Sequence, residues 1–203
     1  IINYVDLLKR EEMEEGIIKE YVDVLDRQSS RLKKLIEDLV DASKASTGNL
    51  VVNSSRTEVG VLLTQTVGEY EERMEDEDLE LILNQSAEEI FIMADGRLLW
   101  RVFDNLMGNI CKYSQPDTRA YLNLENVKGH ATITFRNISK YALNISSDEL
   151  LERFVRGDSA RTTEGSGLGL SIAKSLVELQ GGEFDLIIDG DLFKVILSFP
   201  ILM

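Results

Sequence analysis

Three glycines lie directly before an apolar helix in the stretch Gly165-Ser166-Gly167-Leu168-Gly169-Leu170-Ser171-Ile172-Ala173-Lys174. Glycines allow backbone N–H groups to approach phosphate oxygens closely, and a helix N-terminus adds partial positive charge. On its own such a loop is a weak signal, and a flexible surface turn is the plain alternative. It is not a Walker-type loop, because it lacks the Gly-Lys-Ser/Thr ending. It is not a dinucleotide fingerprint either, because the preceding residues 161–164 are polar and not a buried strand.

Strands and helices alternate on both sides of this loop. Hydrophobic periodicity predicts helices from 55 or 57 to about 75, from 95 to 113 and from 166 to 179, and strands at 50–53, 79–84, 90–94, 120–126, 131–137, 183–188 and 192–199.

Turn and cap residues mark the ends of these elements. Asp95 is expected to cap its helix and Gly181-Gly182 to end the last one. The segments 127–130 and 189–191 read as hairpin turns, the second with a type I′-like signal. Strands gathered in hairpins with helices between them indicate an α+β fold, with helices over one face of one sheet.

The first 44 residues have a different pattern, with helical periodicity and no predicted strand. Residues 1–14 and about 17–44 read as two helices separated near Gly16, and the second repeats apolar residues at close to the 3.5-residue coiled-coil spacing, interrupted at 28–29. A hairpin this thin cannot bury both of its faces. We therefore expect it to pair with a second copy of the chain, the alternative being that it packs on the following domain.

Turn residues at 46–49 predict a domain boundary, so we expect a helical hairpin over 1–48 and a second domain over 49–203. The first residues are already amphipathic helix, without an initiator Met or an N-cap. We therefore expect the chain to be part of a longer protein.

Composition excludes several classes of protein. A net charge of −14 argues against a nucleic-acid partner, and 43% apolar residues suffice for a sizeable core. A single cysteine, Cys111, excludes an internal disulfide and a Cys-based zinc site. It fits a reducing, cytoplasmic setting. No apolar run approaches the roughly 18 residues of a membrane span.

Three motifs, in this order, resemble those of the ATP-binding catalytic domain of sensor histidine kinases. Residues 95–114 resemble the asparagine box of that family, residues 152–158 its phenylalanine box, and residues 165–174 its second glycine box. The match covers roughly residues 50–200. It implies a two-layer α/β sandwich with a mixed sheet and helices on one face. The helices before it resemble the hairpin that carries the phosphorylated histidine.

The resemblance implies roles for the asparagine box. Asn109 would ligate Mg²⁺, since an amide oxygen suits that hard cation beside phosphates. Asn105, one turn earlier on the same face, would support the metal water or the phosphates. Hydrolysing relatives have a glutamate about there, so an amide disfavours hydrolysis. Lys112 would neutralise phosphate charge and Tyr113 would lie against adenine. A helix C-terminus also simply favours Lys, and a Tyr can cap a core.

Further nucleotide contacts are implied on the lid and the glycine loop. Cations on the lid would stabilise charge during phosphoryl transfer, with Arg161 as a catalytic group, although a lone loop Arg is usually solvated. The expected cofactor-binding residues there are Phe154, Arg156, Gly165, Ser166, Gly167, Leu168, Gly169 and Leu170.

One departure from the family concerns the adenine contact. The family commonly has an Asp-x-Gly-x-Gly box whose Asp accepts a hydrogen bond from the adenine amino group. Here Asn137 stands at the expected strand end and both glycines are absent. The amide oxygen of Asn137 can accept the same bond without the charge, so weaker nucleotide affinity is expected.

The only histidine, His130, lies in a predicted hairpin turn and is expected to be a surface residue. The resemblance implies that the acceptor histidine would lie upstream of Ile1. The resemblance therefore predicts a chain that binds ATP and Mg²⁺ without phosphorylating itself. Its parent would transfer the γ-phosphoryl to a histidine and then to a response-regulator aspartate, and is expected to be membrane-anchored. The alternative is a degenerate, pseudokinase-like interaction module with little ATP affinity.

Overall fold

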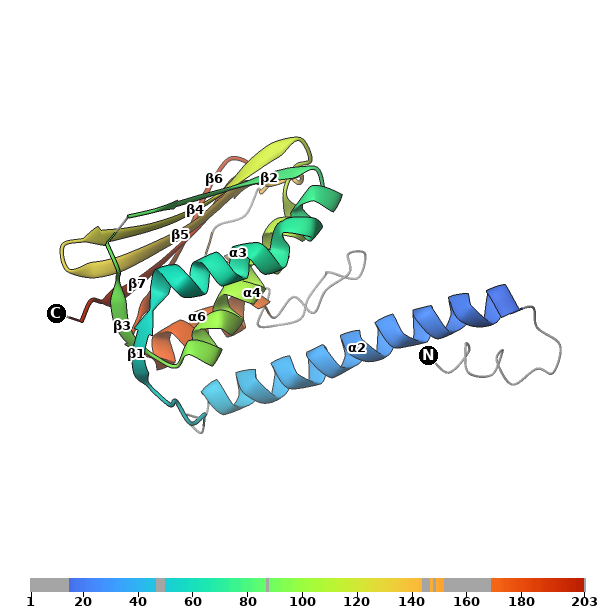
Figure 1. Ribbon diagram of the computed structural model, residues 1–203, viewed down its shortest axis with the longest axis horizontal. Coiled ribbons are helices and arrows are strands. Elements are labelled where there is room, and N and C mark those ends of the chain that lie inside the picture. The colour runs from blue at the N-terminus through green and yellow to red at the C-terminus, as the bar shows by residue number, and fades with distance from the viewer. Residues whose placement is uncertain are drawn as a thin grey trace. The chain divides into compact units, whose positions relative to one another are not determined.

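The computed structural model describes residues 15–46, 50–86, 88–143, 147, 149–151 and 169–202. The chain divides into two compact units, Ile1–Asp41 and Ala42–Met203. The described part of the first belongs to the long helix α2, Glu15–Ser46, whose last residues are counted with the second unit. This helix confirms the predicted second helix (Figure 1). Gly16 lies within its first turn. Residues 1–14, for which the first helix of a hairpin was predicted, lie outside the described residues.

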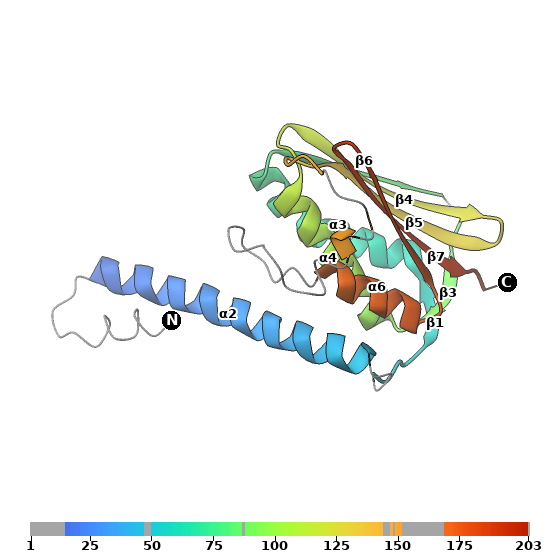
Figure 2. The ribbon, with the colours of Figure 1, turned by 180° about the vertical axis from the view of Figure 1, so that it is seen from behind.

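The second unit is built on a mixed five-stranded sheet. Its order is β2-β4-β5-β7-β6, in which β2 runs parallel to β4 and every other pair is antiparallel. The strands are β2 (Leu79–Gln85), β4 (Thr118–Val127), β5 (His130–Ile138), β6 (Glu183–Asp189) and β7 (Leu192–Pro200). Two of the predicted hairpins are therefore present, β4–β5 and β6–β7 (Figure 2).

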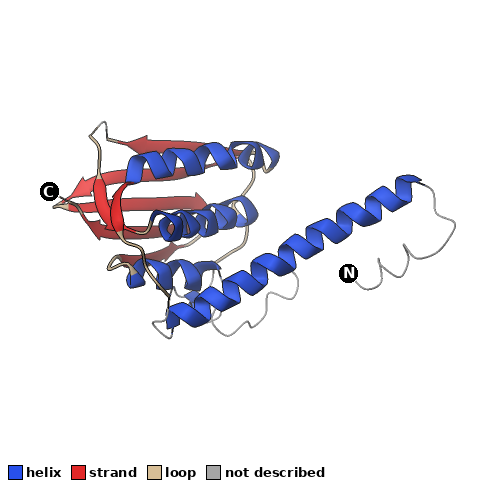
Figure 3. Ribbon diagram, turned by 60° about the horizontal axis from the view of Figure 1, so that its bottom comes forward, coloured by secondary structure: helices blue, strands red, loops and turns tan. Residues whose placement is uncertain are grey.

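Among the described residues, three helices cover one face of this sheet: α3 (Val59–Asp76), α4 (Gly96–Tyr113) and α6 (Gly169–Leu179) (Figure 3). The central helix α4 packs against both α3 and α6. Alternate residues of each central strand are buried under the helices, for example Ile133 and Phe135 of β5. The Phe135 ring lies 5.6 Å from that of Phe103 on α4, measured between centroids. The predicted α+β sandwich with helices on one face is confirmed.

A two-stranded antiparallel ribbon lies beside the main sheet. Its strands are β1 (Ser55–Glu58) and β3 (Phe91–Ala94). The end of the chain returns to it, since Ile92 bridges Ile201 and the Leu202 N–H donates to the Phe91 carbonyl. None of the described helices has the length and apolar character needed to cross a membrane.

The prediction for the start of this unit was wrong in two respects. Residues 50–53 are not a strand; the strand forms at 55–58, where it finds β3 as a partner. Helix α3 is capped by Glu58, whose carboxylate accepts from the Gly60 and Val61 N–H groups, and not by Ser55 or Thr57. Thr57 instead donates its hydroxyl hydrogen to the Ala94 carbonyl across the ribbon.

The two hairpin turns differ in type. Lys128 and Gly129 both have positive φ, as a type I′ turn requires. In the second hairpin only Gly190 has positive φ, so the turn is of type II′ and not the I′-like turn that was predicted. The other predicted helix ends are confirmed. Asp95 caps the start of α4, and Gly181, with a φ of 78°, follows the end of α6.

Candidate active site

Helix α4 presents a polar stripe on the side that packs against α6. At 3.6 residues per turn, Asn105, Asn109 and Lys112 fall within an arc of about 60°. Asn105 is only 8% exposed, while Asn109 and Lys112 are half-buried. The Nδ2 of Asn105 is buried and has no hydrogen-bond partner among the described residues. An unpaired buried donor is costly, which is typical of a position that awaits a ligand.

The start of α6 lies against this stripe. Gly169 is the first residue of α6, and a Cβ placed on it would lie 3.3 Å from Asn105 Oδ1. The side chain of Leu170 is buried in the core, so it can offer a ligand only its backbone. The first turn of any α-helix carries N–H groups without intrahelical partners. The asparagine stripe and an anion-attracting helix end therefore meet here.

A second polar group lies where α4 ends beside the end of β5. Asn137 is 3% exposed and lies on the helix-facing side of its strand. Ser114, the C-cap of α4, forms an isolated β-bridge with Ser139, the first residue after β5, and both serines are buried. Ser114 Oγ has no partner among the described residues. No periodic pattern in the sequence points to either serine, and neither was predicted as a site residue.

Lys112 and Tyr113 lie at the same end of α4. The Lys112 ammonium is 5.0 Å from the centroid of the Tyr113 ring. The Tyr113 carbonyl accepts a hydrogen bond from the Lys140 N–H, at 2.9 Å. The second residue after the end of β5 is thereby tied to the last turn of α4.

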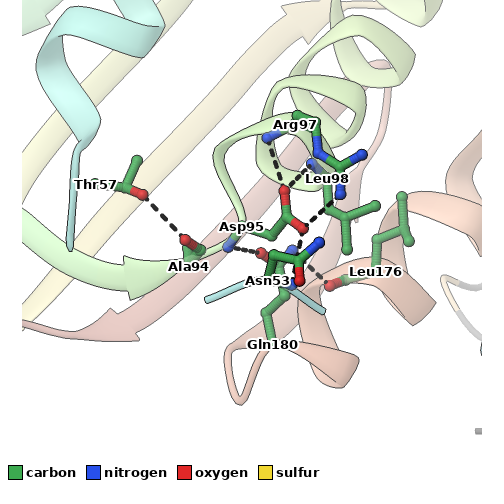
Figure 4. A network of polar contacts seen from close by, with 8 residues as sticks. All are labelled: Asn53, Thr57, Ala94, Asp95, Arg97, Leu98, Leu176 and Gln180. Carbon is green, nitrogen blue, oxygen red and sulfur yellow. Dashed lines mark hydrogen bonds and ion pairs between the residues drawn. The ribbon is translucent and has the colours of Figure 1, made fainter. Parts of the chain in front are cut away.

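The other end of α4 is fixed by Asp95, as Figure 4 shows. Its carboxylate accepts from the Arg97 N–H at 3.1 Å, the Arg97 guanidinium at 3.0 Å and the Asn53 N–H at 3.0 Å. Its own N–H donates to the Gln180 amide oxygen at 2.8 Å, and Gln180 Nε2 donates to the Leu176 carbonyl. Asp95 thus joins the segment before β1, the start of α4 and the end of α6.

Burial alone would raise the pKa of Asp95. The hydrogen bonds from the Arg97 side chain and from the N–H groups of Asn53, Arg97 and Leu98 outweigh it and hold that pKa below its usual value. The cap was predicted from the sequence, but its partners Asn53 and Gln180 were not, because both are distant in the chain.

The α3 side of α4 is held by a buried tyrosine. The Tyr70 hydroxyl lies 3.0 Å from the Asp104 carbonyl and 2.5 Å from Asp104 Oδ1. Burial, and then the neighbouring carboxylate, raise the pKa of Tyr70 far above its ordinary value. Tyr70 therefore stays a neutral donor, and α4 is fixed from the side opposite to its asparagine stripe.

Several predicted site residues lie outside the described residues: Phe154, Arg156, Arg161, Gly165, Ser166, Gly167 and Leu168. His130 is described and is exposed at the start of β5, where it closes the hairpin opposite Val127. It lies seven residues along the strand from Asn137, roughly 23 Å at 3.3 Å per residue. The only histidine is therefore remote from the end of β5 that meets α4.

The residues present fit a magnesium–nucleotide ligand. Within the described ranges, no three His, Cys, Asp or Glu side chains form a group that could hold a metal. Mg²⁺ bound with a nucleotide does not need such a group, because it keeps several waters and takes oxygens from the phosphates. The amide oxygen of the half-buried Asn109, and the buried Asn105 donor that has no partner among the described residues, suit that arrangement.

Residues 94–201 match the family described as "Histidine kinase-, DNA gyrase B-, and HSP90-like ATPase". Among curated proteins, the sensor protein VanSC of Enterococcus gallinarum is 30% identical over 187 residues. That match covers 90% of this chain and 51% of VanSC, so the chain spans about half the length of its relative.

Solved structures of histidine kinases share the fold. Full-length ShkA in complex with AMPPNP aligns with a TM-score of 0.77 at 20% identity, covering 97% of this chain and 41% of that chain. Histidine kinase ThkA, solved in complex with response regulator protein TrrA, aligns with a TM-score of 0.73 at 15% identity, covering 98% and 56%.

Proposed function

The chain belongs to the histidine kinase-, DNA gyrase B- and HSP90-like ATPase family, and on this premise we propose that residues 49–203 are the ATP-binding catalytic domain of a sensor histidine kinase. Residues 1–48 would be part of the dimerisation hairpin. The parent would pass the γ-phosphoryl of ATP to a histidine outside this chain and then to a response-regulator aspartate. Support comes from the similarity to VanSC and from the folds shared with AMPPNP-bound ShkA and with ThkA in its TrrA complex.

The observation that carries this proposal is the contact between the asparagine stripe of α4 and the first residue of α6. Asn109 would hold the Mg²⁺ that accompanies ATP, and that ion would shield the phosphate charge. Asn105 would donate its Nδ2–H, which has no partner in the described part of the chain, to a phosphate oxygen or to a metal-bound water. The N–H groups at the start of α6 would bind the phosphates. Lys112 would add a positive charge on the same stripe.

The chemistry of Asn105 favours phosphoryl transfer to a protein side chain over hydrolysis. A neutral amide cannot take a proton from an attacking water, so it cannot act as a general base. Most of the catalysis would then come from positioning and charge stabilisation. Arg156 and Arg161 are proposed to supply that positive charge from the lid, with Phe154 and residues 165–168 completing the nucleotide contacts.

The dimer is a further part of the proposal. Helix α2 has exposed apolar side chains at Val22, Leu32, Ile36 and Val40. These lie close to a coiled-coil spacing, so a second copy of α2 would bury them. We place this part of the protein in the cytoplasm, where ATP and the response regulator are available.

Calorimetric titration with ATP, with and without Mg²⁺, tests the nucleotide site. We expect saturable binding that Mg²⁺ strengthens and that Asn109→Ala weakens at least tenfold, in line with the loss of a metal ligand. Asn84→Ala is the matched control, because Asn84 is an exposed residue of β2 whose side chain donates to the Asn123 side chain across the strands. A folded protein that binds no ATP at millimolar concentration would support the degenerate interaction module instead.

Phosphate labelling tests the location of the acceptor. With ATP labelled on its γ-phosphate, the chain alone is expected to acquire no acid-labile phosphate, because His130 is remote from the Asn137 end of β5. Label that appears on this chain and is lost in His130→Gln would contradict an acceptor outside it.

A further inference from the structure

The resemblance described above implies that the adenine base contacts residue 137, and we propose that Asn137 at this position accepts either a hydrogen-bond donor or an acceptor at the 6-position of a purine, so that the site takes 6-oxo purine nucleotides alongside ATP. This inference rests on the proposed nucleotide-binding function. It concerns the base of the nucleotide, whereas the preceding proposal concerned its phosphates and metal.

Asn137 is a buried carboxamide with little to bond to inside the protein. It is 3% exposed and follows Phe135 on the helix-facing side of β5. Among the described residues its side chain makes one hydrogen bond, from Nδ2 to the carbonyl of the adjacent Ile138 at 3.5 Å. That distance is at the outer limit of a hydrogen bond. A carboxamide has two N–H donors and two acceptor lone pairs, so most of this capacity is unused by the described residues.

The hydroxyl of Ser114, next to Asn137, can also serve as a donor or an acceptor. Ser114 is 4% exposed, and its Oγ has no partner among the described residues. The bridge between Ser114 and Ser139 places Ser114 beside the end of β5, close to Asn137. A hydroxyl donates or accepts by rotating its hydrogen. Both groups at this end of α4 can therefore present a donor or an acceptor to a ligand.

Purines differ at the position that such a group would read. Adenine carries a donating amino group at C6, whereas guanine and hypoxanthine carry an accepting oxygen there. A carboxylate is acceptor-only, so it pairs with the amino group and opposes the oxygen. A carboxamide pairs with either one by turning over about its last bond. For Asn137 that rotation would cost one marginal hydrogen bond of 3.5 Å.

Competition binding tests the inference directly on the wild-type chain. A fluorescent ATP analogue would be displaced by ATP, inosine triphosphate or cytidine triphosphate in the presence of Mg²⁺. We expect the ATP and inosine triphosphate affinities to agree within about tenfold, since only neutral hydrogen bonds are exchanged. The pyrimidine nucleotide should bind more weakly than both. An affinity ratio of ATP to inosine triphosphate above tenfold would overturn the inference.

A pair of matched variants assigns the effect to one residue. Asn137→Asp should raise the ratio of ATP to inosine triphosphate affinity by at least about tenfold, because a charged acceptor would face the 6-oxygen. Asn84→Asp makes the same change on an exposed strand residue and should leave the ratio at its wild-type value. A ratio that Asn137→Asp leaves unchanged would also overturn the inference.

The two proposals fail in different ways. If ATP binds and inosine triphosphate does not, the base inference is wrong and the nucleotide function stands. If the folded wild-type chain binds neither nucleotide, the proposed function is itself wrong. The wild-type comparison decides between these outcomes even if Asn137→Asp does not fold.

Discussion

The α-carbon of Gly169 faces the side-chain amide of Asn105. A methyl group on Gly169 would lie 3.3 Å from Asn105 Oδ1 and 3.8 Å from its Cγ, and Gly169 does not need glycine for its φ. The requirement at this position is therefore one of space. It links the asparagine stripe of α4 to the glycine loop, two motifs that are far apart in the sequence.

Gly169→Ala is expected to weaken ATP binding while leaving the fold intact. The new methyl group would displace Asn105 by a few tenths of an ångström, and we expect a loss of about three- to thirtyfold in affinity, typical of a misplaced positioning group. Thermal unfolding and calorimetric titration check the two effects separately. The control is Gly68→Ala in α3, where a methyl group meets nothing within 4 Å. That change should raise stability by up to about 1 kcal/mol without altering affinity.

Asn105→Leu should separate stability from function. It removes a buried donor that has no partner among the described residues and replaces it with an apolar group of similar size. The folded state should be as stable as wild type or more so, while ATP affinity falls at least about tenfold. Differential scanning fluorimetry and calorimetry give the two values. A variant that loses stability and keeps its affinity would make Asn105 a structural residue only.

The Asp95 network predicts an acid-sensitive component of stability. A depressed pKa means that this component is fully present above the unfolded carboxyl pKa, about 3.9, and is lost as pH falls through the lower folded value. Asp95→Asn keeps a capping group but has no charge to lose, so its urea-unfolding free energy should depend less on pH below about 4. Asp185→Asn changes an exposed residue of β6. It is the control, and its unfolding free energy should keep the wild-type dependence on pH. Equal acid dependence in Asp95→Asn would contradict the prediction.

Removal of the Asp95 cap should lower the unfolding free energy at neutral pH more than Asp95→Asn does. Asp95→Ala leaves the start of α4 and the Asn53 N–H without their acceptor. The expected loss is about 1–2 kcal/mol at neutral pH, measured by urea unfolding. A loss below about 0.5 kcal/mol would show that water replaces the carboxylate at no cost.

Cys111 should be inert in the folded protein. Burial raises the pKa of its thiol, and its Sγ lies 3.3 Å from Met74 Sδ between α4 and α3. A disulfide reagent should therefore react through opening of the structure, on the order of 100-fold or more slower than with the unfolded chain. Because the chain has one cysteine, the released chromophore reports this residue alone. Asn84→Cys provides an exposed thiol for comparison, and rapid reaction of wild type would mean that the α3–α4 contact opens readily.

Local patterns predicted those parts of the fold that local contacts determine. The strand pairs β4–β5 and β6–β7 are joined by short turns, so alternation and turn residues were enough to find them. The strand at 55–58 was misplaced, because its partner β3 lies more than thirty residues away and supplies the hydrogen bonds that define it. Nothing near residue 50 in the sequence reports that pairing.

The same distinction holds for the candidate site. The shared face of Asn105, Asn109 and Lys112 follows from helical periodicity. Asn137 was predicted as a site residue because it stands at the strand end where the family has its Asp. Ser114 was not predicted as a site residue because a serine at a helix end can be either exposed or buried, and the sequence does not distinguish the two. Its burial depends on the bridge to Ser139, which is a tertiary contact.

The place of α4 in the chain has a consequence for how the molecule is made. This helix lies in the connection between the parallel strands β2 and β4, and most of what covers it, namely β4, β5, α6 and β7, follows it in the sequence. As the chain leaves the ribosome, the asparagine stripe emerges before the surfaces that bury it. An unfinished chain that stops short of Gly169 would therefore lack one wall of the site. The proposed nucleotide site would therefore form only after α6 has been synthesised, and not when α4 alone has folded.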